Sequence, residues 1–259
     1  MNTTAMRTWT WRDTLGVYLR EAGYQFWKNL RMPGFVLPTL AFPTMFYLFF
    51  GLLFGHSNGI NMAAYLLATY GTFGIMSPAL FGFGVGVAME RERGSLALKR
   101  VAPMPPMAYM LAKAVMAMLF AMIIAVLLFS LGALFGHVVL PHHIWLTLAA
   151  VLMFGTIPFC ALGLTVGLSV GGQSSAAIIN LIYLPMSFLS GLWIPIKFMP
   201  HFLQVFAQLL PAYHLAQIAL GTIGMGDGGQ LAWHLIYLLV FSAACLRIAQ
   251  ISWHRIQDR

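Results

Sequence analysis

The chain alternates between long apolar tracts and short polar segments, and the polar segments hold almost all of its charge. Six tracts are long enough to cross a bilayer core, which requires roughly 20 apolar residues for about 30 Å. To within a few residues they run over 35–55, 62–89, 107–135, 144–169, 176–194 and 231–251. This pattern predicts an all-α integral membrane protein with six transmembrane helices, folded as one domain over 34–259.

Two further segments have a helical pattern that does not fit a span. Residues 9–31 place apolar side chains on one face, namely Trp11, Leu15, Tyr18, Ala22 and Phe26, and charged ones on the other. We expect region 1–33 to be a cytoplasmic amphipathic helix on the membrane surface, with a solvated helix that packs on a partner as the alternative. Region 195–229 is too apolar for a free loop and is interrupted by Pro211, which predicts two short re-entrant helices on the outer side.

The overall composition excludes an ordinary soluble domain. The chain is 60% hydrophobic and only 8% charged, with a mean hydropathy of +0.83. Its net charge of +8 does not indicate a nucleic-acid partner, because the basic residues lie beside apolar tracts rather than in one aromatic-lined patch. Cys160 and Cys245 lie inside apolar tracts and are expected to be small core residues. Region 1–33 lacks the apolar centre of a cleavable signal peptide.

The basic residues predict an orientation in the membrane. If there are six spans, thirteen of the fourteen lysines and arginines fall on one side, and only Lys197 falls on the other. Because basic residues accumulate on the cytoplasmic side, both termini are expected there. We therefore interpret the chain as a multi-pass protein of a bacterial cytoplasmic (inner) membrane, in contact with its lipids.

Six of the eleven residues in 90–100 are charged, and spans flank this run on both sides. A charged cytoplasmic segment of this length, followed by three prolines up to residue 106, fits a coupling element that docks in a cleft of a soluble partner. A solvated loop that only sets topology is the alternative. The candidate docking residues are Glu90, Arg91, Glu92, Arg93, Gly94, Ser95, Lys99 and Arg100.

The membrane interior lacks the groups that an ion-coupled carrier uses. No Asp or Glu occurs between Arg31 and Glu90, or between Arg100 and Asp227. The chain also contains no G-x-x-x-x-G-K-[ST] phosphate loop, so it is not expected to hydrolyse ATP itself. Any uphill transport must therefore take its energy from a partner.

Two patterns resemble chemical sites but have plainer explanations. Residues 167–171 match the G-x-S-x-G nucleophile motif, yet the strand, histidine and acid that this motif requires are missing there. Gly163, Gly167 and Gly171 instead predict a ridge of small residues for close helix packing. Histidines gather on the outer side, at His137, His142 and His143 and at His201, His214 and His234, but their spacing does not indicate a metal site.

The fifth tract is kinked by Pro185 and carries a mild polar face. Such a face suits either the wall of a transport pathway or the contact between packed helices, and both interpretations stay open. The candidate residues for the pathway or a dimer interface are Asn180, Tyr183, Ser187, Ser190, Gly82 and Gly86.

These features together resemble the membrane subunits of type-two ATP-binding-cassette exporters. The strongest part of the resemblance is ERERGSL at 90–96, the proline step at 103–106, and Tyr109 and Lys113 at the entry of the next helix. A second part comprises SGLWIP at 190–195, Met199-Pro200 and LLPAYH at 209–214, and a weaker third part is LLFG at 52–55.

The resemblance implies a half-transporter that pairs with a second copy of itself or a homologous permease. It also implies two separate ATPase subunits, which would hold ATP and Mg and dock under 90–100 and the N-terminal helix. No catalytic residue, cofactor or metal is expected in this chain. The leading expectation is export of a hydrophobic or amphipathic compound, a drug or a lipid, and the main rival is a polysaccharide or lipid-linked glycan. A membrane-embedded enzyme or an assembly factor without transport is the alternative from a different class.

Overall fold

The computed structural model describes residues 11–52, 62–95, 106–227 and 231–257, and within these ranges every regular element is a helix. The elements are α1 (Trp11–Leu30), α2 (Pro33–Phe46), η1 (Tyr47–Leu52), α3 (Met62–Ser77), η2 (Pro78–Val85), α4 (Gly86–Glu92), α6 (Pro106–Leu134), α7 (His142–Phe154), α8 (Thr156–Ser169), α9 (Gly172–Leu189), η3 (Ile196–Phe198), α10 (His201–Ala207), α11 (Pro211–Thr222) and α12 (Leu231–Gln257). The all-α prediction is therefore confirmed for this part of the chain.

Five helices among the described residues are long and apolar enough to cross a membrane. They are α2 with η1 (Pro33–Gly51), the continuous α3, η2 and α4 (Met62–Glu92), α6 (Ala108–Leu134), α7 with α8 (His142–Ser169), and α12 (Leu231–Trp253). They coincide with the first four predicted tracts and the last. The remaining tract forms α9, an 18-residue helix that carries Gln173 and Asn180 and is not among the five. The six-span count stays a prediction.

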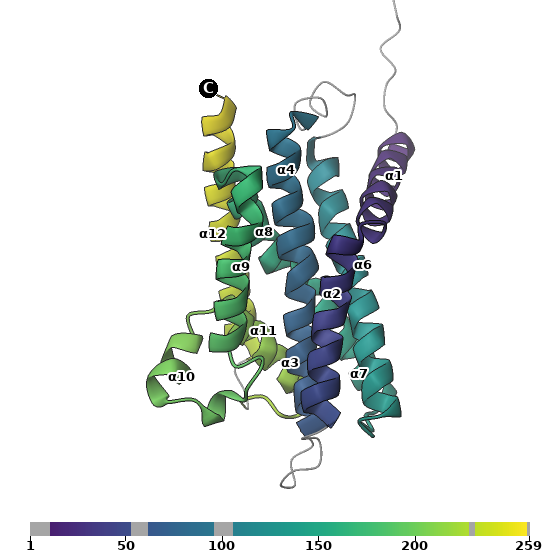
Figure 1. Ribbon diagram of the computed structural model, residues 1–259, viewed down its shortest axis with the longest axis vertical. Helices are drawn as coiled ribbons and strands as arrows, with labels where there is room; N and C mark the ends of the chain where they lie inside the picture. Colours follow the sequence, from purple (N-terminus) through teal and green to yellow (C-terminus); the bar gives the residue numbers. More distant parts are fainter. Residues whose placement is uncertain (1–10, 53–61, 96–105, 228–230, 258–259) are drawn as a thin grey trace, which may run out of the picture.

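The helix formed by α3, η2 and α4 lies in the middle of the bundle (Figure 1), and most of its side chains are buried. Aromatic rings join it to its neighbours on the side of α2 and α9. Phe73 stacks on Tyr183 of α9 at 5.0 Å between ring centroids, and Tyr70 stacks on Phe46 of α2 at 6.0 Å. Since apolar contacts surround it, this helix forms the core against which the others pack.

Glycines allow α8 to approach the central helix to backbone contact. A Cβ at Gly167 would lie 2.5 Å from the carbonyl oxygen of Gly84, and a Cβ at Gly84 would lie 2.8 Å from that of Gly163. The predicted ridge therefore holds for Gly163 and Gly167. Gly171 does not take part, because a Cβ there would meet nothing within 4 Å. It lies just beyond the end of α8, where the chain turns towards α9.

The N-terminal helix α1 packs on α6 at the end of the molecule where α12 also finishes (Figure 1). Ala22 and Asn29 are buried in this contact, and Phe26 lies 5.3 Å from Phe120 between ring centroids. The predicted apolar face of this helix is only partly buried, since Leu15, which belongs to it, is exposed. Trp27, outside the predicted face, is exposed as well. Placement of α1 on the membrane surface stays a prediction.

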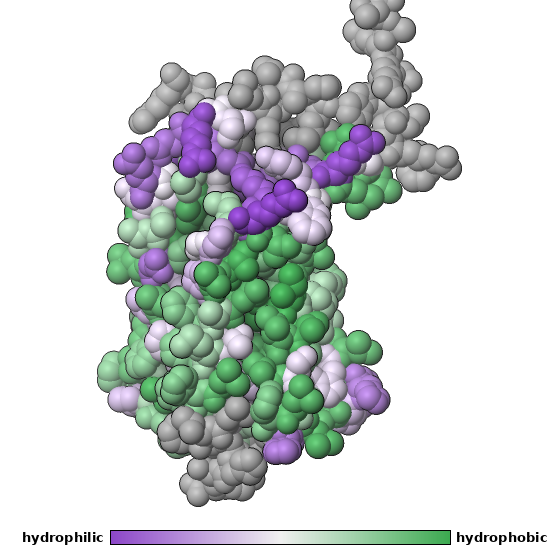
Figure 2. Space-filling view, turned by 45° about the vertical axis from the view of Figure 1, so that its right-hand side comes forward, coloured by the Kyte–Doolittle hydropathy of each residue, from purple (hydrophilic) through white to green (hydrophobic). Residues whose placement is uncertain are grey.

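The short helices α10 and α11 lie at the opposite end of the molecule from α1 (Figure 1), and the chain is interrupted before Pro211 as expected. Their re-entrant position in a membrane stays a prediction. Figure 2 shows a broad hydrophobic band across the middle of the visible face, with hydrophilic residues gathered mainly at the α1 end. This distribution is typical of a protein surface that faces lipid.

Candidate coupling site

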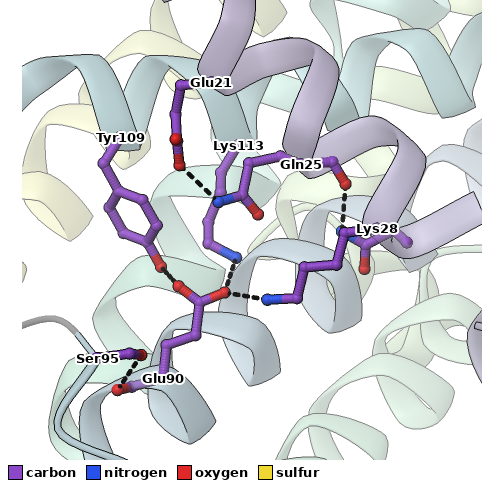
Figure 3. Close-up of polar contacts among 8 residues, drawn as sticks. Glu21, Gln25, Lys28, Glu90, Ser95, Tyr109 and Lys113 are labelled. Carbon is purple, nitrogen blue, oxygen red and sulfur yellow. Dashed lines mark hydrogen bonds and ion pairs between the residues drawn. The ribbon is translucent and has the colours of Figure 1, made fainter. Parts of the chain in front are cut away.

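The carboxylate of Glu90 is the centre of a polar cluster at the α1 end of the molecule (Figure 3). Glu90 Oε1 contacts Lys28 Nζ at 2.5 Å and Lys113 Nζ at 3.4 Å, and Glu90 Oε2 accepts a hydrogen bond from Tyr109 at 2.6 Å. We call Lys28, Glu90, Tyr109 and Lys113 the Glu90 node. It joins α1, α4 and α6 at a single carboxylate.

The local sequence explains how these groups meet. Tyr109 and Lys113 are four residues apart on α6, so both side chains project from one face of that helix. Glu90 lies at the end of the long helix that α4 completes, and Lys28 lies in the last turn of α1. Gly86 makes room for the cluster, because a Cβ there would lie 2.8 Å from Lys113 Nζ.

The node is largely withdrawn from solvent. The side chain of Lys113 is 1% exposed and that of Glu90 is 10% exposed, whereas the side chain of Lys28 is 36% exposed. A buried ammonium is stable only when a carboxylate and hydrogen bonds replace its water. Glu90 supplies that partner for Lys113, and the hydroxyl of Tyr109 donates to the second carboxylate oxygen of Glu90.

The next two residues of α4 bind the ends of α8 and α9. The guanidinium of Arg91 donates to the carbonyl oxygens of Leu168 and Val170, the latter at 2.7 Å, where α8 ends. Glu92 Oε2 accepts a hydrogen bond from the backbone N–H of Gln173 at 3.1 Å, in the first turn of α9. A cation at a helix C-terminus and an anion at an N-terminus are both favourable with the helix dipole.

The predicted docking residues therefore divide into two groups. Glu90 and Arg91 make contacts within the protein, and Ser95 donates to the carbonyl oxygen of Glu90 at 2.8 Å. The second group is exposed and comprises Arg93, Gly94 and also Glu92, which keeps its contact with Gln173. Gly94 has a φ of 72° that suits a glycine at a helix end. Lys99 and Arg100 lie outside the described residues.

Most of the candidate pathway residues are buried between the helices of a single copy of the chain. Tyr183, Ser187 and Ser190 on or next to α9 are buried, and Tyr183 donates to the carbonyl oxygen of Phe73 at 3.3 Å. A Cβ at Gly82 would meet Phe35 and Met116, so this glycine faces α2 and α6, as Gly86 faces Lys113. Asn180 is the member of the set that is exposed.

Sequence reasoning did not find the node itself. From the sequence alone, Glu90 is predicted to be a surface docking residue, and Tyr109 and Lys113 enter only through the family resemblance. A lysine within an apolar tract, four residues after a tyrosine, was a usable signal, because such a charge is expected to be paired. Lys28 could not be found in this way, since it lies 62 residues from Glu90.

The G-x-S-x-G motif has a structural role in the arrangement observed. Ser169 Oγ donates to the carbonyl oxygen of Thr165 at 2.8 Å and lies 3.2 Å from Ser252 Oγ. The first contact lies within α8, and the second ties the end of α8 to α12. They do not form a nucleophile activated by a base.

Two comparisons with known proteins identify relatives of this chain. Residues 22–223 match the family model described as ABC-2 type transporter. A protein of Bacillus subtilis (strain 168) named "Putative transport permease YvfS" is 29% identical over 234 residues, which cover 87% of this chain and 92% of that protein. The family match includes all four residues of the Glu90 node.

Proposed function

The chain belongs to the ABC-2 type transporter family and is the membrane subunit of an ABC transporter, and from this premise we propose that it exports a hydrophobic or amphipathic compound, a drug or a lipid. Two separate ATPase subunits supply the energy. A second copy of this chain, or a homologous permease, completes the pathway.

The observation that carries the proposal is the position of the Glu90 node beside an exposed charged turn. Glu92, Arg93 and Gly94 face solvent at the end of α4, directly after the carboxylate that binds α1 and α6. Arg91 and Glu92 extend the connection to α8 and α9. A soluble partner that moves this turn would therefore act on five helices through the hydrogen bonds and ion pairs given above.

The course of α9 supports six crossings with both termini on the cytoplasmic side. This helix begins next to Glu92 at the α1 end and finishes near α10 at the other end (Figure 1). The α1 helix and the last turns of α12 lie at the same end (Figure 1). Under the positive-inside rule that end is cytoplasmic, because the exposed Arg93 and Arg247 lie there while Lys197 lies at the other end.

The outward face of α9 supports both the pairing and the apolar cargo. Leu181, Leu184 and Phe188 are exposed on it, and Asn180 is the polar residue among them. Apolar side chains of this kind suit either the contact with a second permease or a pathway for a greasy compound. A glycan pathway would require many more polar and aromatic groups along this face.

The docking role is tested by removing the exposed charges of the turn. Glu92→Ala combined with Arg93→Ala should reduce co-purification of the ATPase about tenfold, which corresponds to ~1.4 kcal/mol of binding free energy. The measurement is the ratio of ATPase to permease after purification from membranes. Normal recovery of the ATPase with this double variant contradicts docking at 90–100.

Two controls separate docking from folding. Arg247→Ala combined with Gln250→Ala truncates two exposed side chains at the same end on α12, and should leave the ratio unchanged. Arg93→Ala alone keeps the contact between Glu92 and α9, so it should still lower the ratio. A loss seen only when Glu92 is changed indicates a defect at α9 instead.

The cargo is tested with vesicles that contain the permease and its ATPase. ATP should drive a labelled lipid or an amphipathic dye across the membrane, and the Glu92→Ala and Arg93→Ala double variant should not support this movement. Movement of a lipid-linked glycan, with none of the lipids or dyes, favours the glycan alternative. Transport without any ATPase contradicts the proposal as a whole.

A further inference from the structure

A second polar cluster lies where α11 meets the start of α12, at the opposite end of the molecule from the Glu90 node. His214 Nδ1 and His234 Nδ1 face each other at 2.7 Å, and both rings are buried, with 2% and 3% of the residue exposed. His214 Nε2 lies 2.9 Å from the carbonyl oxygen of Gln208, and His234 Nε2 lies 3.1 Å from Asp227 Oδ2.

The turn after α11 brings Asp227 to this pair. Gly224 has a φ of 74°, and the N–H of Met225 donates to the carbonyl oxygen of Leu220 at 2.9 Å, which closes the end of α11. A Cβ at Gly226 would lie 2.9 Å from Gly221 Cα, so the returning chain needs a glycine there. The carboxylate that follows is thereby held next to His234.

The contacts determine how many protons the two rings share. A carbonyl oxygen accepts only, so His214 Nε2 must carry a hydrogen, and an ionised Asp227 requires one on His234 Nε2 as well. The two Nδ1 atoms need exactly one more hydrogen between them to bond at 2.7 Å. Three ring hydrogens on two imidazoles give the pair one positive charge, which the negative charge of Asp227 balances.

The surroundings favour His234 as the ring that holds the extra proton. Burial lowers the pKa of His214, and this effect outweighs the hydrogen bond to the carbonyl oxygen of Gln208, which raises it. Asp227 contacts the ring of His234, so we place the shared hydrogen on His234 Nδ1, which donates to His214 Nδ1. On the described elements that pack on α11 or α12, the other titratable groups include Tyr213 and Tyr237 next to the rings, Tyr65 and Tyr70 on α3, His142 and His143 on α7, Cys160 on α8, and Cys245 and Arg247 on α12.

We propose that the proton between His214 and His234 is a pH-dependent clamp that holds α11 against α12. Loss of this proton leaves two nitrogen lone pairs facing each other at 2.7 Å, and a second proton makes two N–H groups face each other. Both states repel. The clamp is therefore closed over an intermediate range of pH and weakens at both the acid and the alkaline limit.

The contacts of Tyr237 remain when the clamp opens. Its ring stacks on His214 at 3.7 Å between ring centroids, and its hydroxyl donates to the carbonyl oxygen of Leu209 at 2.7 Å. The start of α11 thus stays tied to α12 while the histidine bond is lost. That the clamp lies on the outer side of the membrane rests on the proposed function, which places the α1 end on the cytoplasmic side. The proton count does not depend on it.

The direct test is ¹⁵N NMR of the purified permease in lipid nanodiscs, with label in the histidines, between pH 4 and 9. The wild type should show two coupled rings that share one proton in the intermediate range. Among the signals of the eight histidines, those of the coupled pair should both be lost in His234→Gln. Two rings that titrate independently, or two neutral rings throughout, overturn the proposal. Neither readout requires ATPase or transport, so a failed docking experiment does not affect it.

Thermal unfolding as a function of pH gives a second measurement. The wild-type midpoint should follow a bell-shaped profile, and Asp227→Asn should move the alkaline limb to lower pH by about one to two units, because the imidazolium loses its counter-charge. Tyr237→Phe removes a neighbouring hydrogen bond but leaves the number of protons on the two imidazoles unchanged. It should therefore lower the midpoint at every pH and keep the bell shape. An alkaline limb that is the same in the wild type and Asp227→Asn contradicts the clamp.

Discussion

At the scale of single residues, Glu90 determines the arrangement of charge at the α1 end. It is the shared partner of two lysines, one of which, Lys113, has a side chain that is only 1% exposed. A buried pair of this kind contributes little net stability compared with apolar residues, but removal of one partner leaves the other charge without compensation. The carboxylate is therefore required by the position of Lys113, independently of any role in docking.

Glu90→Gln keeps the shape of the side chain and removes its charge, so the buried Lys113 loses its ion pair with Glu90. We expect the free energy of unfolding to fall by about 3–5 kcal/mol, measured as a lower thermal midpoint in detergent. Glu92→Gln is the matched control, because Glu92 is exposed and its amide oxygen can still accept from Gln173 N–H. Equal midpoints for the two variants would show that the Glu90 node is not a buried ion pair.

At the scale of elements, backbone contact between α8 and η2 sets the geometry of the bundle. Gly84, Gly163 and Gly167 meet with no side chain between the helices. In a membrane, where lipid is as apolar as the helices, close packing of this kind is a main source of helix association. The same approach brings the end of α8 within reach of Arg91, so it also positions the polar contacts near the charged turn.

Gly167→Ala should separate these helices, since its Cβ would lie 2.5 Å from the carbonyl oxygen of Gly84. We expect a loss of about 1–3 kcal/mol in stability from the overpacking, and reduced coupling of ATP hydrolysis to transport. Gly171→Ala is the control four residues later, where a Cβ meets nothing within 4 Å and the stability should change little. Both quantities can be measured on the same purified samples, by thermal unfolding and by ATPase assay.

At the scale of the whole molecule, two polar clusters lie at opposite ends of an apolar bundle. The Glu90 node is associated with α1 and the charged turn, and the His214–His234 pair is associated with α11 and the start of α12 (Figure 1). The hydrophobic band in Figure 2 separates the two ends. The long helix α12 connects these two ends, because it carries His234 at its start and contacts α8 near the Glu90 end.

Sidedness can be measured by thiol labelling in sealed membrane vesicles. In a background where the two buried cysteines, Cys160 and Cys245, are replaced by alanine, Arg93→Cys should react only from the cytoplasmic side and Lys197→Cys only from the outside. Both side chains are exposed, so accessibility to the reagent reports which side each residue faces. Reaction of both from the same side contradicts the six-span topology, and reversed labelling contradicts the cytoplasmic termini.

The amino-acid sequence by itself determined five of the helices that can cross a membrane, and the crossing predicted for 176–194 stays a prediction. That property is local, because a run of apolar residues must satisfy its backbone hydrogen bonds internally whatever surrounds it. The sequence also indicated the interruption before Pro211 and the packing role of Gly163 and Gly167. It placed the family resemblance on residues 90–113 and 190–214, which lie within the region that the ABC-2 type transporter model matches.

Only the tertiary structure decided which polar groups meet. The central helix is apolar on nearly every side, so its sequence contains no periodic signal for the direction in which Glu90 or Gly86 faces. Lys28 and Glu90, or His214 and His234, meet because the packing of helices distant in sequence rotates them towards each other. Which groups pair with a buried charge or imidazole depends on the distances between them and on the protons that they share. Both are set only when the helices pack.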